Sequence, residues 1–112
     1  MAFLSDWGGA AAMVKLVGNF LLISVAESLT EALALVEKGG FDVGATVDML
    51  TRTLLPIPIF QTYGKMIAEQ TVTPDQTGTP MKDLSLFKKT AQGAGAPSPI
   101  SSVLLDLRRG PA

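Results

Sequence analysis

The chain has 112 residues, of which 47% are hydrophobic, and nine basic and ten acidic residues give it a formal net charge of −1. This length fits one compact domain, residues 1–112, and the scattered charges form no basic patch for binding nucleic acid. The sequence contains no Cys and no His. Disulfides, thiolate metal sites and a histidine base are therefore excluded. We expect no metal, and any acid–base chemistry requires lysine or a carboxylate.

Helical periodicity dominates the chain, and no stretch alternates as a strand does. The first predicted helix begins near Gly8, with Ser5 or Asp6 as a possible cap, and runs to about Lys38, where Gly39-Gly40 ends it. Its first half is apolar nearly all round, a pattern typical of a helix that is buried on all sides. The helix is long enough to cross a membrane. Because polar and charged residues interrupt its apolar stretch, we expect a cytoplasmic protein with no membrane segment.

Four shorter helices are predicted after this first one. Asp42 is a good N-cap for a helix over about 43–53, and the Pro56-Ile57-Pro58 stretch breaks the chain before a helix over about 59–69. A polar loop follows over 71–80. The remaining helices are expected over about 82–93 and from Pro99 to Arg109. The predicted fold class is all-α, with one long central helix packed by about four shorter helices.

Lys15 and Asn19 are the first candidates for chemistry, because residues four apart share one face of a helix. Burial of a lysine favours its neutral amine, which can exchange a proton with a substrate hydroxyl. The neighbouring amide can donate to, and accept from, the same substrate. The alternative is that Lys15 extends to water and Asn19 bonds a neighbouring loop. A motif of two residues is a weak signal, so the residues alone favour this structural alternative.

Lys82 and Asp83 are the second candidates, at the predicted start of the fourth helix. A carboxylate in the first turn is favoured by the helix dipole, so Asp83 is interpreted mainly as a helix-start signal. Lys82 is unfavourable at that place unless it meets an anionic group. The residues alone favour the capping interpretation.

In this order, the motifs resemble the C-terminal domain of the 3-hydroxyisobutyrate dehydrogenase family, also called β-hydroxyacid dehydrogenases and related to 6-phosphogluconate dehydrogenase. The resemblance is strongest over GAAAMVKLVGNFLL, from Gly9 to Leu22. It continues through Lys82-Asp83-Leu84 and the Ala96-Pro97-Ser98-Pro99 turn. It thus covers nearly the whole chain and implies an all-helical domain like that of 6-phosphogluconate dehydrogenase.

The resemblance implies hydride transfer between NAD or NADP and a 3-hydroxy acid or its semialdehyde. It implies that Lys15 is the catalytic acid/base, that Asn19 binds substrate and that Lys82 lies near the cofactor. In such enzymes an N-terminal Rossmann domain binds most of the cofactor. Because the sequence contains no Gly-x-Gly-x-x-Gly fingerprint, we expect that this domain is absent and that the isolated chain is inactive.

Two alternatives remain. The apolar surplus suits a non-catalytic helical dimerisation module, and on either interpretation we expect a homodimer built on the central helix. An imine reductase resembles this family in its helical half, but those enzymes generally lack a lysine at the position of Lys15, which argues against this alternative.

Overall fold

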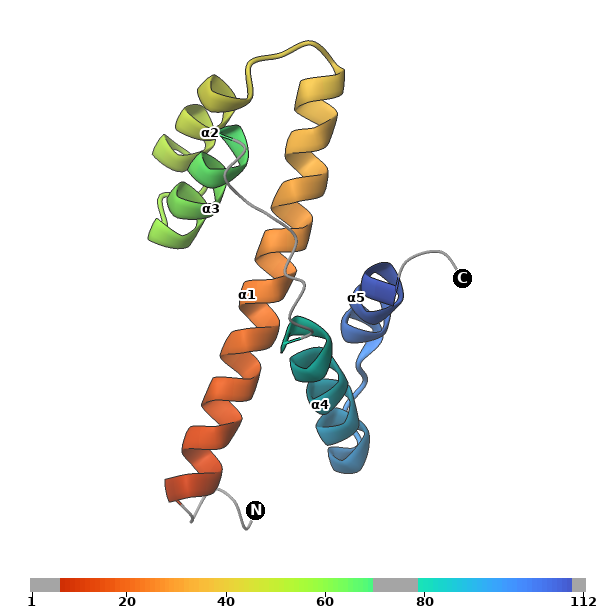
Figure 1. Ribbon diagram of the computed structural model, residues 1–112. Coiled ribbons are helices and arrows are strands. Elements are labelled where there is room, and N and C mark those ends of the chain that lie inside the picture. Colours follow the sequence, from red (N-terminus) through yellow and green to blue (C-terminus); the bar gives the residue numbers. More distant parts are fainter. Residues whose placement is uncertain (1–6, 70–78, 110–112) are drawn as a thin grey trace. The chain divides into compact units, whose positions relative to one another are not determined.

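A computed structural model describes residues 7–69 and 79–109 of the chain. Over these residues every element is a helix and no strand is present, so the predicted all-α class is confirmed. Figure 1 shows one long helix and four short ones. They are α1 (Trp7–Lys38), α2 (Val43–Arg52), α3 (Pro58–Ala68), α4 (Thr79–Ala94) and α5 (Pro99–Arg109).

The long helix α1 is continuous over 32 residues and contains the stretch in which the apolar pattern predicts a central helix. It ends as the two glycines predict. The amide of Phe41 donates to the carbonyl of Val36 at 3.0 Å, and Gly40 adopts a φ of 82°. This is a Schellman ending, in which a left-handed residue lets the last carbonyls find donors. The proposed caps Ser5 and Asp6 lie outside the described residues.

The short helices begin where local sequence signals allow, with small shifts from the predicted bounds. Asp42 caps α2 as predicted, its side chain accepting from the amide of Ala45 at 2.8 Å. Helix α3 begins at Pro58 itself, because proline fits the first position of a helix. Helix α4 begins at Thr79, three residues before the predicted start at Lys82, and takes Pro80 into its first turn. Most of the predicted loop 71–80 lies outside the described residues.

The chain divides into two compact units. Among the described residues, the α2–α3 unit comprises 25–69, and therefore contains the second half of α1 with α2 and α3. Leu29, Leu33 and Val47 form its buried core. Partly buried side chains surround this core: Val36, Val43, Phe60, Tyr63 and Ile67. The core is built by one face of α1 packing against α2 and α3.

Among the described residues, the α4–α5 unit comprises 7–24 and 79–109. Its buried core is formed by Leu84 of α4 with Leu104 and Leu105 of α5. Phe20 and Ile23 of α1 pack against this core, as does Met81. The Phe20 ring also stacks on the Phe87 ring, with centroids 4.1 Å apart and planes 9° apart. Aromatic and aliphatic contacts thus join the first half of α1 to α4 within this unit.

The expectation that the first half of α1 is buried on all sides is wrong for this chain. Val14 is 73% exposed and Leu21 is 54% exposed, whereas the buried residues of α1, Leu29 and Leu33, lie in its second half. The reason is that the helical pattern reports only that a surface is apolar. It does not report which elements are available to cover that surface.

Residues Gly9–Lys38 of α1 are long and apolar enough to cross a membrane by length and composition. None of the most apolar stretch of this helix is buried inside the structure. Core helices of soluble proteins satisfy the same criterion, so this property alone does not identify a membrane segment.

Candidate active site

Lys15 and Asn19 lie one turn apart on α1, because the helix is unbroken through both residues. The Lys15 side chain is exposed, and Asn19 is half-buried. The helix therefore presents an ammonium group and an amide on the same face, as the four-residue spacing predicts.

Asp83 connects the Lys82-Asp83 motif to the Lys15–Asn19 pair through a hydrogen bond. The Asn19 side-chain nitrogen, Nδ2, donates to the carboxylate oxygen Oδ2 of Asp83 at 3.4 Å. The two residues are 64 positions apart in the sequence, and the bond is partly buried. It joins α1 to α4 within the α4–α5 unit. Lys15, Asn19, Lys82 and Asp83 therefore belong to one unit of the molecule.

The interpretation of Asp83 as a helix-start signal is wrong. Helix α4 begins at Thr79, and its first turn contains no acidic residue. Asp83 is thus in the second turn, where the favourable effect of the helix dipole on a carboxylate has largely faded. The Lys82-Asp83-Leu84 motif singles out Asp83, but nothing in the motif indicates its partner, because Asn19 lies 64 positions earlier in the sequence.

Leu84 anchors α4 next to these polar residues. Its side chain is fully buried (0% exposed) in the core of the α4–α5 unit. Phe20, which follows Asn19, stacks on Phe87, one turn beyond Asp83. Within the α4–α5 unit, apolar contacts between α1 and α4 therefore accompany the Asn19–Asp83 hydrogen bond.

The two lysines are available for other interactions. Both side chains are exposed, and among the described residues no hydrogen bond or ion pair involves either of them. Over the same residues, no group of three or more acidic side chains is placed to hold a metal ion. Lysine proton transfer and hydrogen bonding by the Asn19 amide are therefore the chemistry that this cluster can supply.

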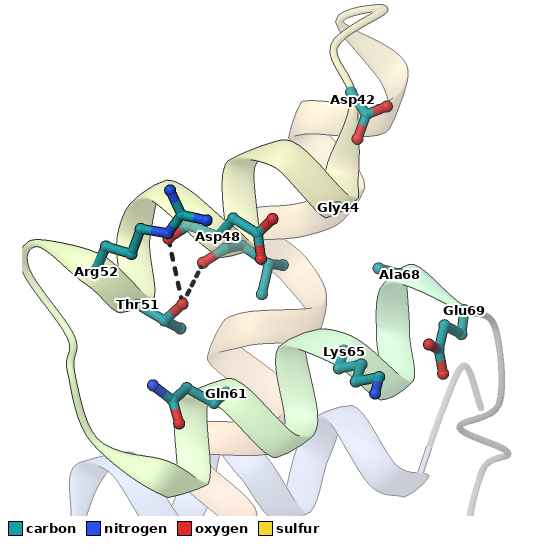
Figure 2. A pocket seen from close by; sticks show the side chains of 10 residues that line it. Asp42, Gly44, Asp48, Thr51, Arg52, Gln61, Lys65, Ala68 and Glu69 are labelled. Atoms are coloured by element: carbon teal, nitrogen blue, oxygen red, sulfur yellow. Dashed lines mark hydrogen bonds between the residues drawn. The ribbon is translucent and has the colours of Figure 1, made fainter.

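A groove of about 750 Å³ lies between α2 and α3 and contains none of these candidate residues. Figure 2 shows Asp48, Thr51 and Arg52 of α2 on one side, with Gln61 and Lys65 of α3 on the other. The remaining lining residues are Asp42, Gly44, Val47, Ala68 and Glu69. No pattern in the sequence predicts this groove. Its charged side chains are exposed and of both signs.

The described residues thus define an all-helical domain that carries a lysine–asparagine–aspartate cluster on α1 and α4. A family model described as NAD-binding of NADP-dependent 3-hydroxyisobutyrate dehydrogenase matches residues 9–109. Because this match covers most of the chain, the chain belongs to this family.

Two curated relatives are named as oxidoreductases. The NADH-dependent oxidoreductase ucdB of Aspergillus ustus is 39% identical over 59 residues, which cover 53% of this chain and 20% of that protein. The oxidoreductase YfjR of Bacillus subtilis (strain 168) is 30% identical over 91 residues, covering 80% of this chain and 32% of that protein. The chain therefore spans a third or less of the length of these relatives.

Proposed function

We propose that this chain is the C-terminal helical domain of an NAD(P)-dependent dehydrogenase that acts on a 3-hydroxy acid or its semialdehyde. In this proposal the domain resembles the helical domain of 6-phosphogluconate dehydrogenase. The observation that carries the proposal is the hydrogen bond between Asn19 and Asp83, since it joins the Lys15–Asn19 face of α1 to the Lys-Asp-Leu motif of α4. Family membership supports the oxidoreductase activity.

Lys15 is the acid/base in this proposal. During oxidation, its neutral amine takes the proton from the substrate hydroxyl while the C–H bond of the carbon that bears this hydroxyl breaks. During reduction, its ammonium returns a proton to the carbonyl oxygen. Asn19, one turn away, hydrogen-bonds the reacting oxygen and orients it toward Lys15. Assistance of this kind accelerates a reaction by typically about 10²–10⁴-fold.

Lys82 is the residue of this chain that would approach the nicotinamide nucleotide. Its ammonium has three hydrogen-bond donors, is exposed and has no partner among the described residues. These donors suit the carboxamide and phosphate oxygens of NAD or NADP, so the residues present fit the group. When bound, NAD or NADP would supply the hydride-transfer chemistry beside the substrate carbon. Lys82 contributes a hydrogen bond and a positive charge beside it.

A Rossmann-type nucleotide-binding domain would supply the rest of the cofactor site. The 112 residues contain no glycine-rich dinucleotide fingerprint, and the described residues contain no strand from which such a fingerprint could extend. In the proposal, Lys15 and Lys82 face a cleft that the nucleotide-binding domain closes. The isolated chain would consequently be inactive.

A chimera tests this proposal. In the chimera, the 91-residue stretch of YfjR that aligns with this chain is replaced by the aligned residues of this chain. The assay follows the oxidation of NADH and of NADPH in the presence of a panel of 3-oxo acids and semialdehydes. We expect turnover by the chimera and none by the 112-residue chain alone. Turnover by the isolated chain would contradict the proposal that a separate nucleotide-binding domain is required for activity. A folded, nucleotide-binding chimera that reduces no member of the panel would contradict the proposed substrate class.

The exposed apolar face of α1 supports a homodimer as part of this proposal. Val14, Val17 and Leu21 are all exposed, and their spacing places them along one side of the helix. A second copy of α1 could cover this stripe and remove it from water. The same stripe, on its own, would equally serve the alternative of a non-catalytic dimerisation module. We also propose a cytoplasmic location, because Lys15 and Asn19 interrupt the apolar half of α1.

Sedimentation equilibrium of the chain at tens of micromolar tests the dimer. We expect a dimer for the unmodified chain, a monomer for Val17→Glu and Leu21→Glu together, and a dimer for the control Met49→Glu, which changes an exposed residue of α2. A monomeric unmodified chain would contradict the dimer. Cosedimentation of the chain with uncharged lipid vesicles would instead support a membrane role for α1 and contradict the cytoplasmic location.

A further inference from the structure

The Asn19–Asp83 hydrogen bond places constraints on the amide that neither helix imposes alone. Asn19 Nδ2 is 3.4 Å from Asp83 Oδ2, and both side chains are half-buried. An ionised carboxylate can only accept hydrogen bonds, whereas an amide donates through nitrogen and accepts through oxygen. The carboxylate therefore determines which end of the amide faces α4.

Without such a partner, the two ends of an asparagine amide are nearly interchangeable, because rotation about its last bond has two broad minima. With the nitrogen held toward Asp83, the oxygen Oδ1 diverges from α4 and is left as an acceptor. Lys15 lies one turn earlier on the same helix face, and its ammonium is without a partner among the described residues. An acceptor at this place suits Lys15, and the second hydrogen on Nδ2 suits the substrate oxygen.

We propose that Asp83 is a positioning residue: it holds the Asn19 amide with Nδ2 toward α4 and Oδ1 free to accept from Lys15. This inference rests on the proposed function for its catalytic consequence, but the orientation of the amide does not depend on that function. In this proposal, Asp83 has no contact of its own with substrate or cofactor. It acts through Asn19, and through Asn19 it orients the Lys15 amine toward the substrate hydroxyl.

Contacts other than the Asn19–Asp83 hydrogen bond also hold α1, α4 and α5 together, so a substitution of Asp83 should change the amide of Asn19 and leave the helices in place. Leu84 is fully buried between α4 and α5, and Phe20 stacks on Phe87 across α1 and α4. Asp83→Asn keeps the size of the side chain but gives position 83 a donor as well as an acceptor. Two facing amides can pair in either orientation, so the constraint on Asn19 is lost while the apolar contacts remain.

Side-chain NMR of the 112-residue chain tests the orientation directly. In the unmodified chain, we expect the Asn19 amide protons to be shifted away from those of an exposed, unpaired amide such as Gln92 on α4. In Asp83→Asn, we expect them to move toward the Gln92 position. The control Asp106→Asn removes an exposed carboxylate that pairs with Arg109, and should leave the Asn19 signals unchanged.

Two results would overturn the proposal. One is an Asn19 amide signal that is identical in the unmodified chain and in Asp83→Asn. The other is a set of backbone shifts through α4 and α5 as large as the change at Asn19, because this would make Asp83 a structural residue. Neither result depends on catalysis, so an inactive chimera would contradict the proposed function while leaving the test of amide orientation intact.

In an active chimera, Asp83→Asn should lower kcat by about 10–100-fold with a smaller change in KM, because misplacement of a catalytic group costs rate more than binding. The exchanged pair, Asn19→Asp with Asp83→Asn, restores one donor facing one carboxylate and keeps an acceptor at position 19. It should recover part of the lost kcat. Recovery no greater than that of Asn19→Asp alone would overturn the proposal.

Discussion

The two units of this chain are similar in construction and different in chemistry. Each packs part of α1 against a pair of short helices around three buried aliphatic residues. The α4–α5 unit contains all four candidate site residues and a polar hydrogen bond between helices. The polar side chains of the α2–α3 unit line an exposed groove of mixed charge, which contains none of the four candidate residues. If the proposed function is correct, the α4–α5 unit contributes chemistry and the α2–α3 unit contributes mainly packing.

The largest effect is expected at Lys15, in the α4–α5 unit. Lys15→Ala and Lys15→Arg should each lower kcat of the chimera by about 10²–10⁴-fold, because both remove the proton carrier. Arginine keeps the positive charge but does not give up its proton at a useful pH. Steady-state rates with saturating nucleotide measure the loss, and fluorescence titration of the nucleotide should show that cofactor binding survives.

Asp48→Asn is the matched control for Lys15, since it changes a charge in the groove of the α2–α3 unit. We expect it to leave kcat unchanged. A comparable loss of kcat in Asp48→Asn would mean that both units contribute to catalysis, and would contradict the assignment of chemistry to the α4–α5 unit alone. Nearly normal turnover in Lys15→Arg would show that Lys15 supplies charge and not a proton.

A smaller effect, on stability, is expected at Gly64 in the α2–α3 unit. A Cβ atom at this position would lie 2.7 Å from Cγ1 of Val47, which is a core residue. Gly64→Ala therefore forces α2 and α3 apart and should lower the free energy of unfolding by about 1–3 kcal/mol. Urea unfolding followed by circular dichroism measures the change.

Gly93→Ala in α4 is the control, because a Cβ at that position meets nothing within 4 Å. Replacing a helical glycine by alanine there should raise the free energy of unfolding by about 0.5–1 kcal/mol. Equal stability of the Gly64 and Gly93 variants would mean that α2 and α3 do not pack as closely as described.

The smallest effect is expected at Asp42, which caps α2 by accepting from the Ala45 amide at 2.8 Å. Asp42→Ala should lower the free energy of unfolding by about 1 kcal/mol, whereas Asp42→Asn keeps a capping oxygen and should cost little. Urea unfolding and hydrogen exchange at the Ala45 amide measure both variants. If the Asn and Ala variants are equally stable, the cap does not contribute to the α2–α3 unit.

The sequence by itself determined the features that depend on neighbours in the chain. Asp42, Gly40 and Pro99 mark helix ends because caps, left-handed turns and first-turn prolines involve residues within about one helical turn. The pairing of Lys15 with Asn19 follows for the same reason, since a helix brings residues four apart onto one face.

Only the tertiary structure decided the contacts between distant segments. Asp83 was interpreted as a helix-start residue, since nothing in its own surroundings points to Asn19, 64 residues earlier. The close approach of Gly64 to Val47 and the exposure of Val14 are likewise invisible in the local pattern. Helical periodicity reports which face of a helix is apolar, but the free energy of covering that face depends on which other segments reach it.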